Sequence, residues 1–141
     1  MESRLDLRIQ QYEDAVGNFG ESLSIDLKGL SDKIIDSIKS GRAQKFEVCV
    51  ELLWKTLKSY LWEVNGIDSK SPKTVVKEAY NQGSFSVQNY EHIIGMLDDR
   101  NKLSHIYEKE QFEAIYLRII NAYPVLIKVL EFLKQGIKPS K

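Results

Sequence analysis

The feature that most constrains this fold is a long stretch, residues 42–65, that contains neither proline nor glycine. Its apolar residues recur every three or four positions, as on one side of an α-helix. Gly66 follows, where a residue suited to positive φ ends a helix well. The apolar face is formed by Phe46, Cys49, Val50, Leu53, Trp54, Leu57, Leu61 and Val64. We therefore predict a helix over Arg42–Asn65 at the centre of the fold.

Helix-breaking residues are also rare in the rest of the chain, which has only three prolines and eight glycines. No long stretch alternates with the period of two that a half-buried β-strand needs. Further helices are predicted over 3–19, 26–40, 72–82, 87–104 and 108–135, and the second of these either stops at Gly41 or continues into the long helix. Pro124 should kink or break the last helix near 121–123, because proline lacks a backbone N–H. We expect one all-α domain over 1–141, an up-and-down antiparallel bundle of about five helices.

Charge and cysteine content exclude several classes of protein. Lys and Arg together number 20, as do Asp and Glu, so the chain lacks the basic excess of proteins that hold long nucleic acids. The lone Cys49 excludes an internal disulfide and a cysteine-based zinc site. We find no secretory signal and no stretch near the ~20 apolar residues of a membrane span. We expect a cytoplasmic protein without a metal site, a cofactor or a membrane partner.

Arg100 is a charged residue on an otherwise apolar helix face. On a helical wheel, Ile93, Met96, Leu97 and Leu103 all lie within about 60° of it. Because a guanidinium keeps its charge, it must pair with a carboxylate, open into a cleft or face another subunit.

Asn101, His105 and Tyr107 lie near Arg100 on the same wheel, so the four side chains could line one polar notch. Two interpretations stay open. In the first, Arg100 is tied to a buried carboxylate and His105 caps a helix end. In the second, Arg100 clamps a phosphate and His105 transfers a proton while the 2′-hydroxyl of an RNA attacks the adjacent phosphorus. This second chemistry needs no metal.

The stretch Arg100–Tyr107 (RNKLSHIY) resembles the R-x4-H-x-Y signature of the HEPN superfamily, and the asparagine directly after the arginine also fits. Other segments resemble its HepT-like branch, the nucleotidyltransferase substrate-binding proteins: 44–47 (QKFE), 51–58 (ELLWKTLK), 60–61 (YL), 71–73 (SPK), 79–80 (AY) and 96–101 (MLDDRN). The resemblance is strongest over 42–133. Residues 18–41 match no motif of the family, so their role stays open.

The resemblance implies a homodimer whose gene lies beside that of a minimal nucleotidyltransferase, as in a toxin–antitoxin pair. In that version the HEPN protein is a metal-independent endoribonuclease with Arg100 and His105 as catalytic residues, acting on RNA at a local site. Tyr107 then accepts AMP from the partner, which silences the toxin. The alternative is a non-catalytic subunit that presents substrate or nucleotide to the partner enzyme. In neither version is the chain a transferase by itself, because it lacks a pair of acidic residues after a Gly-Ser turn.

Two glutamates and a second histidine are weaker candidates. Glu47 and Glu51 are one helical turn apart at the edge of the polar face, where a solvated or salt-bridged role is expected. Glu47 is the better supporting residue, together with Asn101, because it belongs to the family-like Phe-Glu pair and could anchor Arg100. His92 has no second ligand nearby, so we expect it on the surface.

A second apolar strip lies on the opposite side of the long helix. Val48, Leu52 and Trp62 form it, and a helix that is apolar on two sides is normally buried on both. These residues either pack against residues 26–38 or form the dimer surface, where Trp62 would be a plausible anchor.

Overall fold

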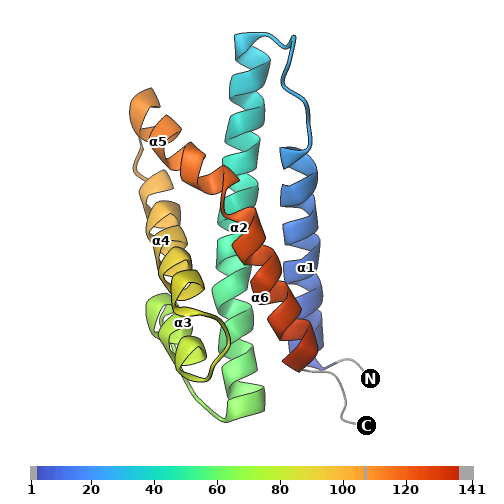
Figure 1. The fold of residues 1–141 in the computed structure, drawn as a ribbon, viewed down its shortest axis with the longest axis vertical. Helices are drawn as coiled ribbons and strands as arrows, with labels where there is room; N and C mark the ends of the chain where they lie inside the picture. The colour runs from blue at the N-terminus through green and yellow to red at the C-terminus, as the bar shows by residue number, and fades with distance from the viewer. Residues whose placement is uncertain (1–2, 107, 137–141) are drawn as a thin grey trace.

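Six α-helices, and no β-strand, make up the part of the chain that the computed structural model describes, residues 3–106 and 108–136 (Figure 1). The helices are α1 (Arg4–Leu23), α2 (Asp32–Asn65), α3 (Pro72–Asn81), α4 (Val87–Leu103), α5 (Lys109–Ile120) and α6 (Tyr123–Gly136). The predicted all-α class is therefore confirmed, with one helix more than the expected five.

Serine caps begin three of these helices. The Ser3 hydroxyl accepts a hydrogen bond from the backbone N–H of Asp6 at 3.1 Å, and the Asp6 carboxylate accepts one from the Ser3 N–H at 3.0 Å. Ser31 caps α2 and Ser86 caps α4 in the same way, each accepting from the N–H three residues on. These contacts satisfy N–H groups that have no partner inside a helix.

The long helix α2 is continuous through Gly41, as one of the two sequence alternatives allowed. The predicted helical segment 26–40 is wrong over residues 26–31, which form the turn between α1 and α2. Gly29 has a φ of 78° there, and Ser31 starts the helix instead. A left-handed glycine followed by a good N-cap ends one element and begins the next.

Pro124 separates α5 from α6, which explains the sixth helix. The predicted helix over 108–135 stops at Ile120 and resumes at Tyr123, within the segment where a break was expected. Proline cannot donate the hydrogen bond that an uninterrupted helix needs, but it fits the first turn of a new helix.

The helices pack around one core, in which α1 and α2 lie side by side and run in opposite directions (Figure 1). Helix α6 packs against α1, and the buried Tyr12 hydroxyl donates to the Leu126 carbonyl at 2.7 Å. Helices α3 and α4 pack on α2 at another side. The largest fully buried side chains are Tyr12, Phe19, Phe46, Leu53, Leu57, Leu61, Ile93, Ile119, Leu126 and Leu133.

The second apolar strip of α2 does not pack against residues 26–38, which corrects that alternative. Val48 is 47% exposed and Trp62 is 61% exposed. Residues 32–38 belong to the same helix as the strip, so they cannot cover it. No helix among the described residues combines the length and the apolar character needed to cross a membrane.

Candidate functional site

Helix α4 carries Arg100 to the side of α2, where it meets a carboxylate. Arg100 Nη2 lies 2.5 Å from Glu51 Oε2, and Arg100 Nη1 donates to the Asn101 side-chain oxygen at 3.4 Å. Glu51 Oε2 is buried and has no hydrogen-bond partner among the described residues, so the contact is an ion pair rather than an aligned hydrogen bond. The geometry matches the first interpretation of Arg100, a charge held by a carboxylate.

Glu51 is the centre of a small charge network. Burial acts to raise its pKa, but side-chain hydrogen bonds from Lys55 and Trp54, together with the charge of Arg100, outweigh it. The pKa of Glu51 is therefore lowered, and the carboxylate stays ionised at neutral pH. Lys55 Nζ lies 3.2 Å from Glu51 Oε1, one helical turn away.

Glu47, one turn earlier, makes no ion pair with Arg100 in the structure; the anchor of the arginine is Glu51. Burial raises the pKa of Glu47, and attraction to Arg100 offsets this only in part. Glu47 is thus near enough for the charge of Arg100 to affect its pKa, but it forms no ion pair with Arg100. A carboxyl group with a raised pKa beside a fixed cation is the kind of group that proton-transfer sites use.

His105 lies just beyond the end of α4 and is exposed. Its backbone N–H donates to the Lys102 carbonyl at 2.9 Å. A cavity of about 490 Å³ lies between this segment and α5, lined by His105 and Asn101 together with Lys102, Ile106, Gln111, Ala114, Ile115 and Arg118. We call it the His105 cavity. Tyr107, the fourth residue of the predicted notch, lies outside the described residues.

A second arginine, Arg118, also lines the His105 cavity. Arg118 of α5 donates to both oxygens of Asp99 on α4, with Nε at 3.0 Å and Nη2 at 2.8 Å. Asp99 is buried, and this paired geometry is the strongest that an arginine makes with a carboxylate. It holds α4 beside α5 where both helices line the cavity.

The predicted site residues therefore divide into two places. Arg100 faces α2 and is engaged by Glu51, whereas Asn101 and His105 line the cavity toward α5. Asn101 joins the two, since it contacts the Arg100 guanidinium and also borders the cavity. A phosphate in this cavity would meet His105 and Asn101 directly, and Arg100 only after it leaves Glu51.

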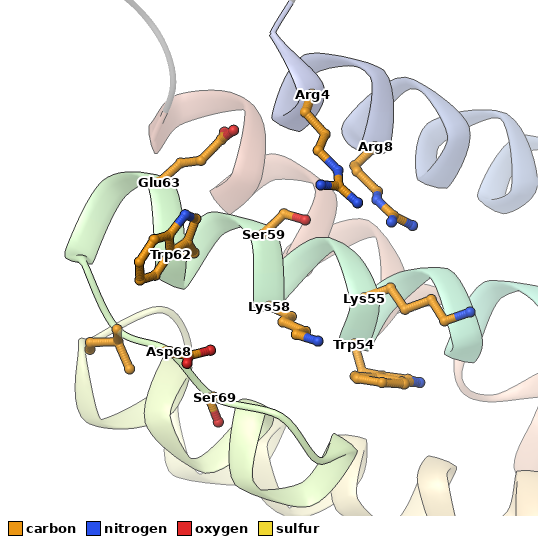
Figure 2. Close-up of a pocket in the computed structure, with 11 residues that line it drawn as sticks. Arg4, Arg8, Trp54, Lys55, Lys58, Ser59, Trp62, Glu63, Asp68 and Ser69 are labelled. Atoms are coloured by element: carbon orange, nitrogen blue, oxygen red, sulfur yellow. The ribbon is translucent and has the colours of Figure 1, made fainter.

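A second hollow lies at the other end of α2, near the start of α1 (Figure 2). It has a volume of about 430 Å³ and combines both tryptophans of the chain with basic side chains. Lys55, which binds Glu51, is one of its lining residues. The sequence contained a signal for this hollow, because Trp54, Lys58 and Trp62 are spaced four residues apart on one helix.

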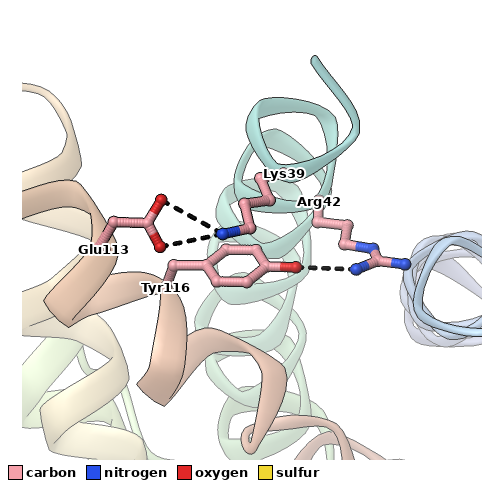
Figure 3. A network of polar contacts seen from close by, with 4 residues as sticks. All are labelled: Lys39, Arg42, Glu113 and Tyr116. Carbon is pink, nitrogen blue, oxygen red and sulfur yellow. Dashed lines mark hydrogen bonds and ion pairs between the residues drawn. The ribbon is translucent and has the colours of Figure 1, made fainter. Parts of the chain in front are cut away.

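Polar contacts also tie the start of α2 to α5 (Figure 3). Lys39 Nζ donates to both Glu113 oxygens, at 3.0 and 3.3 Å, and Arg42 Nη1 donates to the Tyr116 hydroxyl at 2.8 Å. These contacts fix the position of α5, which forms one wall of the His105 cavity.

Sequence reasoning missed the role of one residue, Glu51, and the importance of another, Arg42. Glu51 was recognised as a candidate, but its role as the partner of Arg100 depends on how α4 is rotated against α2. Arg42 was not singled out, although it stands one turn before Phe46 on the buried face of α2. Its burial, at 5% exposure, is therefore consistent with the helical period.

Metal ligands do not gather in the described part of the chain, where no three His, Cys, Asp or Glu side chains could hold an ion together. His92 is exposed, as expected, and borders a different hollow from His105.

Comparisons with known proteins support one part of the resemblance seen in the sequence, the nucleotidyltransferase substrate-binding family. A family model described as "Nucleotidyltransferase substrate binding protein like" matches residues 7–135, which include nearly all of the described chain. A protein from Thermus thermophilus with a solved crystal structure is similar in fold, with a TM-score of 0.76 and 28% sequence identity. That match covers 87% of this chain and 98% of the Thermus chain. No curated protein matches the chain significantly.

Proposed function

Because this chain belongs to the nucleotidyltransferase substrate binding protein-like family, we propose that it is the non-catalytic, substrate-binding subunit of a two-component nucleotidyltransferase. The match over residues 7–135 carries the proposal, because it spans α2, α4 and α5, which position the candidate site. The catalytic half is then a separate minimal nucleotidyltransferase, encoded nearby.

The His105 cavity is where this subunit would present a substrate. A volume of about 490 Å³ suits a small ligand or a short extended segment. Asn101 and His105 supply polar groups for recognition, while Ile106 and Ile115 supply apolar surface. Arg100 is paired with Glu51, so the positive charge at this cavity comes from Lys102 and from Arg118, which is itself paired with Asp99.

Co-expression with the neighbouring nucleotidyltransferase tests this proposal. A tagged chain should copurify with the enzyme at a fixed ratio, and the pair should transfer a nucleotidyl group that neither protein transfers alone. Replacing both Asn101 and His105 by alanine should weaken substrate capture by about tenfold, which corresponds to about 1.4 kcal/mol. His92→Ala is the matched control, since His92 is the chain's other histidine. It is exposed, as His105 is, but it lies on α4 outside the His105 cavity. Failure of the two proteins to copurify would overturn the proposal.

We also propose that the helices work as an up-and-down antiparallel bundle that forms a homodimer. Val48 supports this, because it is 47% exposed and lines, with Leu52, a hollow between α1 and α2 that a second copy would cover, whereas Trp62 lines a different hollow. Analytical ultracentrifugation of the pure chain measures its oligomeric state. A monomer at all concentrations would exclude the dimer.

A second candidate function is the HEPN-type endoribonuclease toxin. It is favoured by the R-x4-H-x-Y spacing and by the exposure of His105 on a cavity that Asn101 also lines. For this chemistry Arg100 must leave Glu51 to reach a phosphate of the RNA. Silencing by the partner would then attach AMP to Tyr107.

Two measurements separate this candidate from the first. RNA cleavage by the pure protein should disappear in His105→Ala and persist in His92→Ala; equal cleavage by both variants marks a contaminant. Mass spectrometry of the co-expressed protein should find an adenylyl group on Tyr107. An unmodified Tyr107, together with no cleavage, leaves the substrate-binding role.

A further inference from the structure

The hollow between α1 and α2 has a composition unlike the rest of the surface. Its floor is formed by Trp54, Lys58 and Trp62 of α2, one wall by Arg4 and Arg8 of α1, and the other by the loop that contains Ser69 (Figure 2). We call this hollow the tryptophan trough. It shares no lining residue with the His105 cavity.

The floor of the trough follows from helical spacing. Trp54, Lys58 and Trp62 stand at intervals of four residues, each about 40° further round α2, so all three line the trough although Trp62 lies at the edge of the second apolar strip. Eight residues of helix span about 12 Å along the helix axis between the backbone positions of Trp54 and Trp62. A cation, Lys58, lies between them.

The two tryptophans play different parts. Trp54 is half-buried and packs against the hydrophobic core, which fixes it in the floor of the trough. Trp62 is 61% exposed and stands at the open end. An exposed indole offers a flat face on which an aromatic ring can stack.

The charge in the trough favours an anion. Figure 2 shows Arg4 and Arg8 extending side by side from α1 toward α2, and neither makes an ion pair with a described residue. Lys58 adds a third positive charge from the floor. Glu63 and Asp68 also line the trough, but the cations outnumber them. Two arginines side by side match the several oxygens of a phosphate group.

Ser69 lies in the loop that forms the other wall of the trough. Ser69 is 6% exposed, and its Oγ has no hydrogen-bond partner among the described residues. Buried hydroxyls nearly always have a partner, and leaving one unpaired costs free energy. Figure 2 draws the Ser69 hydroxyl pointing away from Lys58 and Trp62, and its Oγ is fully enclosed, so we assign it no contact with a ligand in the trough.

From the exposed indole and the two arginines we propose that the tryptophan trough binds a nucleoside phosphate, with its base stacked on Trp62 and its phosphate held by Arg4 and Arg8. The volume of about 430 Å³ lies within the range of small-ligand sites. The zero net charge of the chain argues against a long nucleic acid as the ligand. This site goes beyond the proposed function, since it needs neither the partner enzyme nor the His105 cavity.

Intrinsic fluorescence gives a direct readout, because the only two tryptophans of the chain both line the trough. We would titrate the pure full-length chain with ATP, AMP, adenosine and inorganic phosphate, and repeat the titrations by calorimetry. The two nucleotides should give a saturable change in fluorescence. Adenosine and phosphate should each bind at least about tenfold more weakly, because each keeps only part of the contacts.

Variants assign the contacts. The double variant Arg4→Gln and Arg8→Gln should weaken ATP binding by at least about tenfold. The matched control, Lys28→Gln with Lys33→Gln, removes two exposed cations outside the trough and should bind ATP as the wild type does. Trp62→Leu should weaken binding, whereas Trp62→Phe retains a stacking ring. Circular dichroism verifies that each variant is helical.

Three results would overturn the proposal: no saturable response to ATP or AMP, equal affinity of the arginine variant and its control, or tighter binding of inorganic phosphate than of AMP. Tighter binding of a short single-stranded RNA than of ATP would also overturn it, in favour of a groove for nucleic acid. Because the titration uses the isolated chain, these failures leave the partnership with the nucleotidyltransferase untouched. Loss of copurification, conversely, leaves the titration valid.

Discussion

The guanidinium of Arg100 lies against the carboxylate of Glu51, with Arg100 Nη2 2.5 Å from Glu51 Oε2. This contact joins the last turn of α4 to the middle of α2, and the same carboxylate also binds Lys55. The arginine of the R-x4-H-x-Y signature is therefore a structural group in the isolated chain. Any function that needs a free guanidinium must first break the pair.

Replacing Glu51 by glutamine tests this ion pair. The folded-state pKa of Glu51 is lowered, so its carboxylate stabilises the fold above the unfolded-state pKa and loses this effect as pH falls through the folded-state pKa. Because the pair is partly exposed, Glu51→Gln should cost on the order of 0.5 kcal/mol at neutral pH. Urea unfolding should show that this difference vanishes in acid. A difference that is independent of pH would contradict the ion pair.

Replacing Glu47 by glutamine should raise the free energy of unfolding, whereas Glu51→Gln lowers it. Burial raises the folded-state pKa of Glu47, so protonation favours the fold, and that advantage is lost as pH rises through the folded-state pKa. Glu47→Gln removes a carboxylate that is costly to keep ionised, so the variant should be more stable than wild type at neutral pH. The gain should shrink in acid. Glu51→Gln is the internal control for the urea unfolding series, since the two glutamates are one turn apart.

The helical wheel predicted that Arg100 needs a partner, because its position among Ile93, Met96 and Leu97 follows from chain spacing alone. It could not select Glu51 over Glu47. That choice depends on the rotation and axial shift of α4 against α2, which long-range packing sets. For the same reason the sequence placed Arg100 and His105 in one notch, whereas the structure directs them to different sides of the end of α4.

The sequence predicted helix ends correctly where a single residue determines the backbone conformation. Pro124 predicted the break between α5 and α6, and Gly66 predicted the end of α2. The helix expected over 26–31 failed because its residues have acceptable helix propensity while Gly29 adopts positive φ. Helix propensities summed over a segment do not reveal that one glycine adopts a positive φ and so ends the helix.

Two glycines of α1 should respond to alanine in opposite directions. A Cβ on Gly20 would lie 2.7 Å from Tyr123 Cε1, so the ring of Tyr123, which packs on Phe19, would have to move. We expect Gly20→Ala to cost about 1–3 kcal/mol through overpacking. A Cβ on Gly17 meets nothing within 4 Å, so Gly17→Ala should stabilise the helix by about 0.5–1 kcal/mol. Thermal unfolding measures both, and equal shifts would contradict the close approach of α6.

Replacing Arg42 should destabilise the fold far more than replacing its neighbour Lys39, although both contact α5; in Figure 3 Arg42 extends toward α1 and meets the hydroxyl of Tyr116. Arg42 is 5% exposed, and it donates to the Ser22 carbonyl at 2.9 Å, the Ile25 carbonyl at 3.1 Å and the Tyr116 hydroxyl at 2.8 Å. It therefore caps the end of α1 and ties α5 to α2 with one side chain. Lys39 makes a half-exposed ion pair with Glu113.

We would compare the free energies of unfolding of Arg42 and Lys39 variants. Arg42→Met leaves the buried Ser22 carbonyl and the part-buried Ile25 carbonyl without this donor, so it should cost about 2–4 kcal/mol. Arg42→Lys should recover only part of this loss, because an ammonium cannot reach three acceptors in the fork geometry of a guanidinium. Lys39→Met should cost less than about 1 kcal/mol, as exposed pairs do. Urea unfolding of the three variants gives these values. Full recovery by lysine would mean that Arg42 contributes only its charge, and the capping of α1 by Arg42 would have to be abandoned.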